Sequence, residues 1–102
     1  MTTHIIKLDN TFNLHDVDIE LKRIFETNTD IIFVFDIINA NILDWRLLLS
    51  IIPMLKKYNR EIIESLTKSI IVAPYKWQHL ILNAFFFIYP PIKPYEIVHT
   101  FN

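Results

Sequence analysis

The chain has 102 residues, 52% of them apolar, with 10 Lys and Arg residues against 11 Asp and Glu residues and a formal net charge of −1. This length predicts a single domain spanning residues 1–102, with enough apolar material for one core. The balanced charge argues against nucleic acid as a partner, because phosphate polymers attract strongly basic surfaces. The chain contains no cysteine, which excludes disulfides and thiolate chemistry and favours a reducing, intracellular location.

Glycine is also absent, whereas a domain of this length usually contains about seven. Phosphate-binding loops, dinucleotide-binding turns and nucleophile elbows all need backbone positions that glycine occupies, so these enzyme classes are excluded as sequence motifs. The surplus of Ile, Asn and Lys suggests an AT-rich genome, such as that of a large DNA virus. We therefore expect a cytoplasmic protein, located in the host cytoplasm or the virion if the source is viral.

Four segments have the apolar, β-branched composition of strands, namely residues 4–9, 31–38, 69–73 and 95–99. Segment 31–38 is apolar without alternation, which predicts a central strand covered on both faces. Pro94 precedes the last segment, and charge interrupts it, so we predict an edge strand there. No apolar run reaches the roughly 18 residues of a membrane-spanning helix.

Three helices are predicted between the strands. Asn13 is expected to cap a helix that runs to about residue 27. A second helix begins at residue 43 or 44 and reaches residue 58, with a kink or restart at Pro53 and a further short turn over residues 60–66. The third helix covers residues 75–89. This order predicts an α/β fold with a small, mostly parallel sheet of four or five strands joined by right-handed crossovers, the strand order remaining open.

The third helix carries more apolar residues than one core face requires. The core face predicted from helical spacing contains Trp77, Leu80, Ile81, Ala84, Phe85 and Ile88. A further set widens that face: Leu82, Phe86 and Tyr89. The second helix similarly adds Trp45 and Leu49 beside its own core stripe. Either the two helices pack on each other, or the surplus is exposed and contacts a partner.

The segments Phe33-Val34-Phe35-Asp36-Ile37-Ile38 and Asn41-Ile42-Leu43-Asp44-Trp45-Arg46-Leu47-Leu48 resemble the STAS domain, a family of anti-sigma-factor antagonists and transporter tails. The resemblance covers nearly the whole chain in element order. Asp44 and Leu47 keep the family pattern, whereas Trp45 and Arg46 replace hydroxyl residues, including the phosphorylatable serine. The resemblance implies a non-catalytic protein-interaction or scaffold module that has no cofactor and contacts a protein partner or a second copy.

The second half of the chain is similar to the C-terminal lobe of CRAL-TRIO domains over residues 57–66 and 70–74 and at Trp77. Those domains are longer and use extra helices to gate a lipid pocket. This weaker resemblance implies an alternative function, the binding of a small ligand or lipid in a cleft near residues 39–45 and 73–77.

The candidate binding surface follows the carboxyl end of the central strand, where α/β sheets bind ligands. It presents Trp and Arg, the side chains most enriched at binding hot spots. The predicted binding residues are Asn39, Asn41, Asp44, Trp45, Arg46, Tyr75 and Phe86.

The remaining polar residues predict no catalytic or metal site. None of the four histidines forms a short-spaced pair with another histidine or a carboxylate, and no serine lies on a turn that would expose it as a nucleophile. Asp36 and Asp44 could hold a cation or polar substrate, but a strand-end aspartate and a helix cap explain them as well. A basic cluster is interpreted as a solvated, salt-bridged face: Lys56, Lys57, Arg60 and Lys68.

Overall fold

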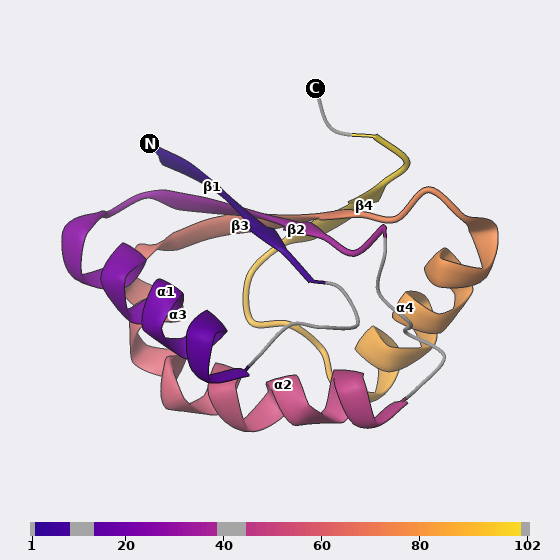
Figure 1. Cartoon of the computed structure of the whole chain (residues 1–102), viewed down its shortest axis with the longest axis horizontal. Coiled ribbons are helices and arrows are strands. Elements are labelled where there is room, and N and C mark those ends of the chain that lie inside the picture. Colours follow the sequence, from indigo (N-terminus) through magenta and orange to yellow (C-terminus); the bar gives the residue numbers. More distant parts are fainter. Residues whose placement is uncertain (1, 9–13, 39–44, 101–102) are drawn as a thin grey trace.

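The computed structural model describes residues 2–8, 14–38 and 45–100. The elements in chain order are β1 (Thr2–Lys7), α1 (Leu14–Thr27), β2 (Ile31–Asp36), α2 (Trp45–Lys57), α3 (Asn59–Ser65), β3 (Leu66–Val72), α4 (Lys76–Ile88) and β4 (Tyr95–Val98). Figure 1 shows a sheet with a layer of helices beneath it. The predicted α/β class is confirmed, and the expected short turn after the second helix is α3.

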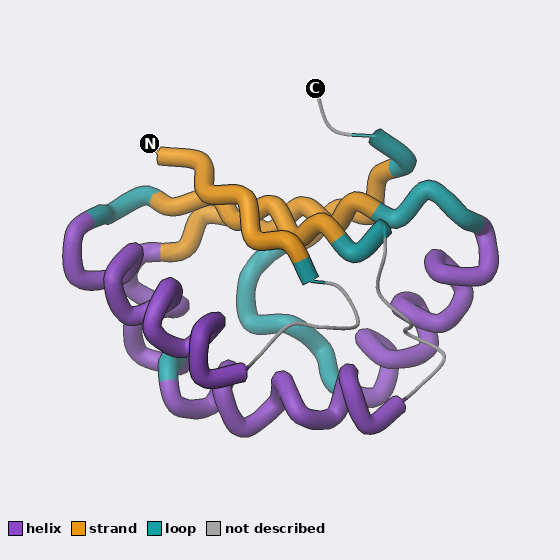
Figure 2. Tube along the Cα trace, in the orientation of Figure 1, coloured by secondary structure: helices purple, strands orange, loops and turns teal. Residues whose placement is uncertain are grey.

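The sheet has the order β1-β2-β3-β4, and every neighbouring pair is parallel. Each strand therefore lies beside its predecessor in the sequence. When successive crossovers share one hand and proceed in one direction, their helices must fall on the same side of the sheet. Figures 1 and 2 show this arrangement, with the described helices all on one face. As predicted, β2 is an inner strand and β4 lies at an edge.

The prediction that β2 is covered on both faces is wrong, because the described helices cover one face only. Phe33 on β2 belongs to the cluster packed against the helices, whereas its neighbour Val34 belongs to a separate cluster with Ile70 and Val72. Val34 is nevertheless only 1% exposed. The apolar side chains of adjacent strands shield one another on the open face, which explains why β2 lacks the alternation of a half-exposed strand.

Helices α1 and α2 follow the sequence pattern closely. In α1, Leu21 and Ile24 are buried, with Val17 and Phe25 packed against the same core, at the spacing of one helical face. Helix α2 continues through Pro53 without a restart. Proline removes the hydrogen bond to the carbonyl four residues earlier, and that residue, Leu49, is exposed, so water can satisfy the carbonyl.

The predicted core face of the third helix is wrong in part, since Phe85 is buried and Ile81 packs against the core as predicted, whereas other members of that face are exposed. In α4 the buried residues are Gln78, Leu82 and Phe85, while Leu80 is 72% exposed and Ile88 is 60% exposed. Gln78 explains the rotation: its Nε2 donates to the Ile37 carbonyl at 3.3 Å, and its Oε1 accepts from the Tyr75 N–H at 3.2 Å. The predicted core face did not include this glutamine, which anchors α4 to the residue that follows β2.

Candidate functional site

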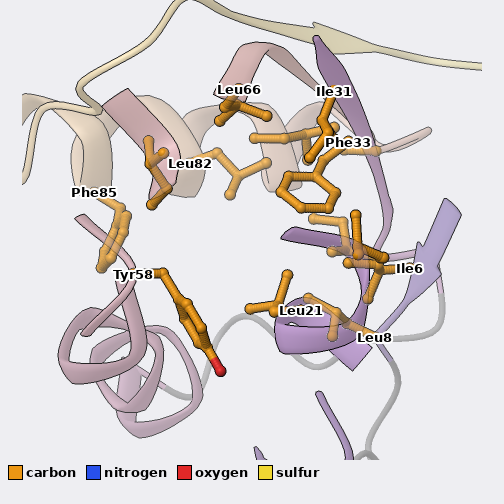
Figure 3. Close-up of a cluster of buried hydrophobic side chains, with 14 residues drawn as sticks. Ile6, Leu8, Leu21, Ile31, Phe33, Tyr58, Leu66, Leu82 and Phe85 are labelled. Atoms are coloured by element: carbon orange, nitrogen blue, oxygen red, sulfur yellow. The ribbon is translucent and has the colours of Figure 1, made fainter. Parts of the chain in front are cut away.

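An apolar cavity of about 460 Å³ lies between the sheet and the helical layer. Its inner wall combines strand residues with helix residues that face them. Figure 3 shows buried side chains from both layers, of which Phe33, Tyr58, Leu82 and Phe85 line the cavity. The core residues of this protein therefore surround a space that their own side chains do not fill.

Exposure of the lining residues locates the mouth of the cavity. The inner wall is buried, for example at Leu21, Phe33 and Ile71. The exposed part of the lining comes from the end of α2 and from the segment that follows α4: Leu55, Ile88, Tyr89 and Ile92. The cavity therefore opens between these two segments, at residues 55–59 and 88–95.

Aromatic rings build the wall beside this mouth. The Phe86 ring lies 4.4 Å from that of Tyr95, and the Phe85 ring lies 5.3 Å from that of Tyr89, measured between centroids. Phe85 and Phe86 also meet edge to face at 5.7 Å. These contacts tie α4 to β4 and to the intervening segment, and they give one side of the mouth a rigid apolar surface.

Tyr58 contributes its ring to the cavity wall and its hydroxyl to a polar link between helices. The ring stacks on Phe25 at 5.6 Å, and the hydroxyl donates to the Asp18 carboxylate and to the Asp18 carbonyl oxygen at 3.0 Å. Lys57 binds the same carboxylate at 2.8 Å. Burial and Asp18 raise the pKa of Tyr58 to about 12, so the hydroxyl stays neutral.

The pKa of the Asp18 carboxyl shifts in the opposite direction to that of Tyr58. Hydrogen bonds from Lys57 and Tyr58 hold the pKa of Asp18 below its ordinary value of 3.8. The two groups therefore stay in complementary states, a charged acceptor and a neutral donor, across the neutral range. Neither is poised to move a proton near pH 7, so this link has a structural role beside the cavity.

Charge in the described lining is confined to the mouth. Of the described residues that line the cavity, only Lys56 and Lys93 are charged, and none is acidic. Lys56 lies on α2 and Lys93 lies on the segment before β4, so the two cations belong to the two sides of the mouth. Lys93 is half-buried, and neither lysine forms an ion pair with a described residue.

The residues predicted from sequence do not all fall within the described structure. Asn39, Asn41 and Asp44 lie outside the described residues, and Trp45 and Arg46 begin α2 without described side chains. Their assignment as binding residues stays a prediction.

The other two predicted residues lie at opposite ends of α4. Tyr75 is 52% exposed and stacks on Trp77 at 6.1 Å, next to the start of the helix. Phe86 is half-buried and lines the cavity near the end of the helix. Of this pair, only Phe86 belongs to the cavity.

The polar residues that the sequence singled out have structural partners. Asp36 accepts a hydrogen bond from the Ile38 N–H at 3.1 Å, which matches its interpretation as a strand-end aspartate. Three members of the basic cluster form ion pairs, which agrees with a salt-bridged face: Lys57 with Asp18, Arg60 with Glu64, and Lys68 with Glu96. Lys56 differs from them because it lines the cavity instead.

Two histidines that are distant in sequence meet in the structure. The rings of His79 and His99 stack with centroids 4.7 Å apart. His79 Nε2 lies 2.6 Å from the Ala73 carbonyl and His99 Nδ1 lies 3.2 Å from the Pro74 carbonyl, so one nitrogen of each ring is engaged by backbone. Because the two rings are stacked, their nitrogens do not point toward a common position where a metal ion could bind. Within the described part of the chain, no three His, Asp or Glu side chains group closely enough to hold a metal ion.

Sequence reasoning missed the cavity itself. It placed a ligand cleft near residues 39–45 and 73–77, and no described residue of those ranges lines the cavity. The available signals were the apolar surplus of the third helix and the prolines at positions 90 and 91, which carry the chain away from α4 across the cavity mouth. Neither signal reveals a volume, because a volume depends on how far apart the two layers stand.

Comparison with known proteins adds no relative. No protein-family model, curated protein or solved structure matches this chain. The resemblances to STAS and CRAL-TRIO domains therefore stay predictions. Among the residues described, no helix combines the length and the apolar character needed to cross a membrane.

Proposed function

We propose that this protein binds a small, largely apolar ligand in the cavity between its sheet and its helices. The observation that carries the proposal is the cavity of about 460 Å³, whose described lining is apolar apart from a few groups concentrated near the mouth. Ligand pockets usually measure roughly 300–1,000 Å³ and have mostly apolar walls. The volume and the chemistry of this cavity both fall within that description.

The chemistry of the inner wall favours an apolar occupant over water. A buried water needs about two to four polar partners, and the inner wall offers few polar groups. An apolar ligand needs no such partners, and the removal of its surface from water favours its binding there.

Binding is favoured over catalysis by the same lining. The Tyr58 hydroxyl is committed to Asp18, and no described carboxylate or histidine lines the cavity. General acid and base catalysis needs such groups within hydrogen-bond reach of the substrate. We therefore assign the site to retention of a ligand rather than to its conversion.

The test is a cavity-filling substitution. Ile52 lies on α2, is half-buried and lines the cavity, so Ile52→Phe should occupy part of the volume. We expect the natural protein to bind the neutral probe 1-dodecanol, and Ile52→Phe to weaken that binding about tenfold, a change of about 1.4 kcal/mol. Isothermal titration calorimetry below the solubility limit of the alcohol measures both affinities.

Ile63→Phe is the matched control. Ile63 is 50% exposed on α3 and does not line the cavity, so the same substitution there should leave dodecanol binding unchanged. If the natural protein failed to bind dodecanol, or if both variants weakened binding equally, the proposal that the cavity is the ligand site would be wrong.

A second candidate function is protein interaction, as the STAS resemblance implies. Its supporting observation is the outer face of α4, where Leu80 is 72% exposed and Phe87 is 88% exposed, seven residues apart on one helical face. Exposed apolar patches of this kind mark interaction surfaces. The simplest such interaction is contact between two copies of the chain through this face, and it can be measured directly.

Sedimentation velocity over a range of protein concentrations tests this second candidate. The natural chain should associate as concentration rises, and Phe87→Ser should weaken the association without lowering the melting temperature, because Phe87 contributes little to the core. A natural chain that sedimented as a monomer at every concentration would contradict self-association through α4.

A further inference from the structure

The two lysines at the cavity mouth indicate which kind of ligand the cavity accepts. The described lining contains Lys56 and Lys93 as its charged residues and contains no acidic residue. An apolar volume that ends at two positive charges is complementary to a molecule with an apolar body and a negative end. A ligand with a positive end would meet repulsion at the same place.

The environment of Lys93 strengthens this complementarity. The side chain is half-buried beside exposed apolar residues of the mouth, and it has no ion-pair partner among the described residues. A partly desolvated ammonium group without a counter-charge is unfavourable. Two other lysines that do not line the cavity have such partners, since Lys57 pairs with Asp18 and Lys68 pairs with Glu96. An anionic group at the mouth would provide Lys93 with the partner that the protein does not supply.

We propose that the ligand is a single-chain amphiphile with an anionic head group, of which a free fatty acid is the simplest member; this inference rests on the proposed function of the cavity. The acyl chain lies in the apolar interior, near Phe33, Ile71 and Leu82. The carboxylate stays at the mouth, where Lys56 and Lys93 bind it from the two segments that form the opening. Charge-assisted hydrogen bonds of this kind are stronger than neutral ones.

The experiment compares three probes of equal chain length: dodecanoate, 1-dodecanol and dodecyltrimethylammonium. Each is titrated calorimetrically, below its critical micelle concentration or solubility limit, into the natural protein and into the double variant Lys56→Met/Lys93→Met. We expect dodecanoate to bind the natural protein about tenfold or more tightly than dodecanol, and the ammonium probe to bind more weakly than dodecanol. In the double variant the preference for dodecanoate should disappear while the affinity for dodecanol is retained.

Lys22→Met is the matched control. Lys22 is exposed on α1 and does not line the cavity, so this variant should keep the full preference for dodecanoate. Equal binding of dodecanoate and dodecanol by the natural protein would overturn the head-group inference and leave apolar ligand binding intact. Loss of both affinities in the double variant would also overturn it, because the lysines would then support the fold rather than the head group. Failure of both dodecanoate and dodecanol to bind the natural protein would overturn the proposed function as well.

Discussion

Tyr58 illustrates how one side chain serves two environments. Its ring belongs to the wall of an apolar cavity, and its hydroxyl reaches Asp18 on α1, forty positions away in the sequence. Burial opposes ionisation of the hydroxyl, and the neighbouring carboxylate opposes it further. The neutral hydroxyl can therefore donate to Asp18 while the ring remains in contact with Phe25. This contact joins α1 to the junction between α2 and α3.

The raised pKa of Tyr58 predicts a loss of stability at alkaline pH. Because its folded-state pKa of about 12 lies above the ordinary value of 10.0, the bound proton stabilises the fold below about pH 10. This contribution, on the order of 2–3 kcal/mol, is lost as the pH rises towards about 12. Tyr58→Phe should abolish this part of the alkaline loss. Urea unfolding at several pH values measures it.

Tyr75→Phe is the control for the alkaline experiment, since the Tyr75 ring is 52% exposed and is not part of the Asp18 link. It should reproduce the alkaline loss of the natural protein. If Tyr58→Phe and the natural protein lost stability in parallel between these pH values, the hydrogen bond to Asp18 would not be the source of the effect.

At the scale of the element, α4 shows how a polar anchor can override apolar periodicity. Gln78 is completely buried and bridges the Ile37 carbonyl and the Tyr75 N–H, so its position on the core side is defined by two hydrogen bonds. Leu82 and Phe85 follow it at helical spacing and are buried with it. The helix is apolar on nearly every side, which leaves the anchor to decide which apolar residues face the core.

A pair of leucines on α4 tests this rotation. Leu82 is 4% exposed, so Leu82→Ala should lower the free energy of unfolding by about 2–5 kcal/mol. Leu80 is 72% exposed, so Leu80→Ala should change it by no more than about 0.5 kcal/mol. Denaturant unfolding of the two variants provides the measurement. A larger loss from Leu80→Ala would instead support the core face that periodicity predicts.

At the scale of the whole molecule, the helical layer covers one face of the sheet and encloses a cavity. The radius of gyration is 12.9 Å, close to the roughly 13 Å expected for a domain of about 100 residues, so the chain remains compact around this volume. Many large apolar residues are nevertheless exposed, including Phe87 and Ile92. The apolar content of the chain is thus divided between the walls of a cavity and several exposed positions on the surface.

The sequence by itself determined the types and order of the elements. Runs of β-branched residues and helical spacing are local signals, and they placed four strands and the intervening helices within a few residues of their observed positions. Local signals also identified Asp36 as a strand-end residue and agree with the i,i+4 ion pair of Arg60 with Glu64. The central position of β2 followed from its uninterrupted apolar run.

Only the tertiary structure decided the rest, because the remaining features depend on distances between segments that are far apart in the chain. The one-sided covering of the sheet follows from the strand order, which periodicity does not encode. The rotation of α4 depends on a hydrogen bond between Gln78 and Ile37, forty-one positions earlier. The cavity depends on the spacing between two layers, and the presence of both Lys56 and Lys93 in its lining depends on where the chain crosses after α4. Long-range packing creates such sites from residues whose local patterns are those of an ordinary core and surface.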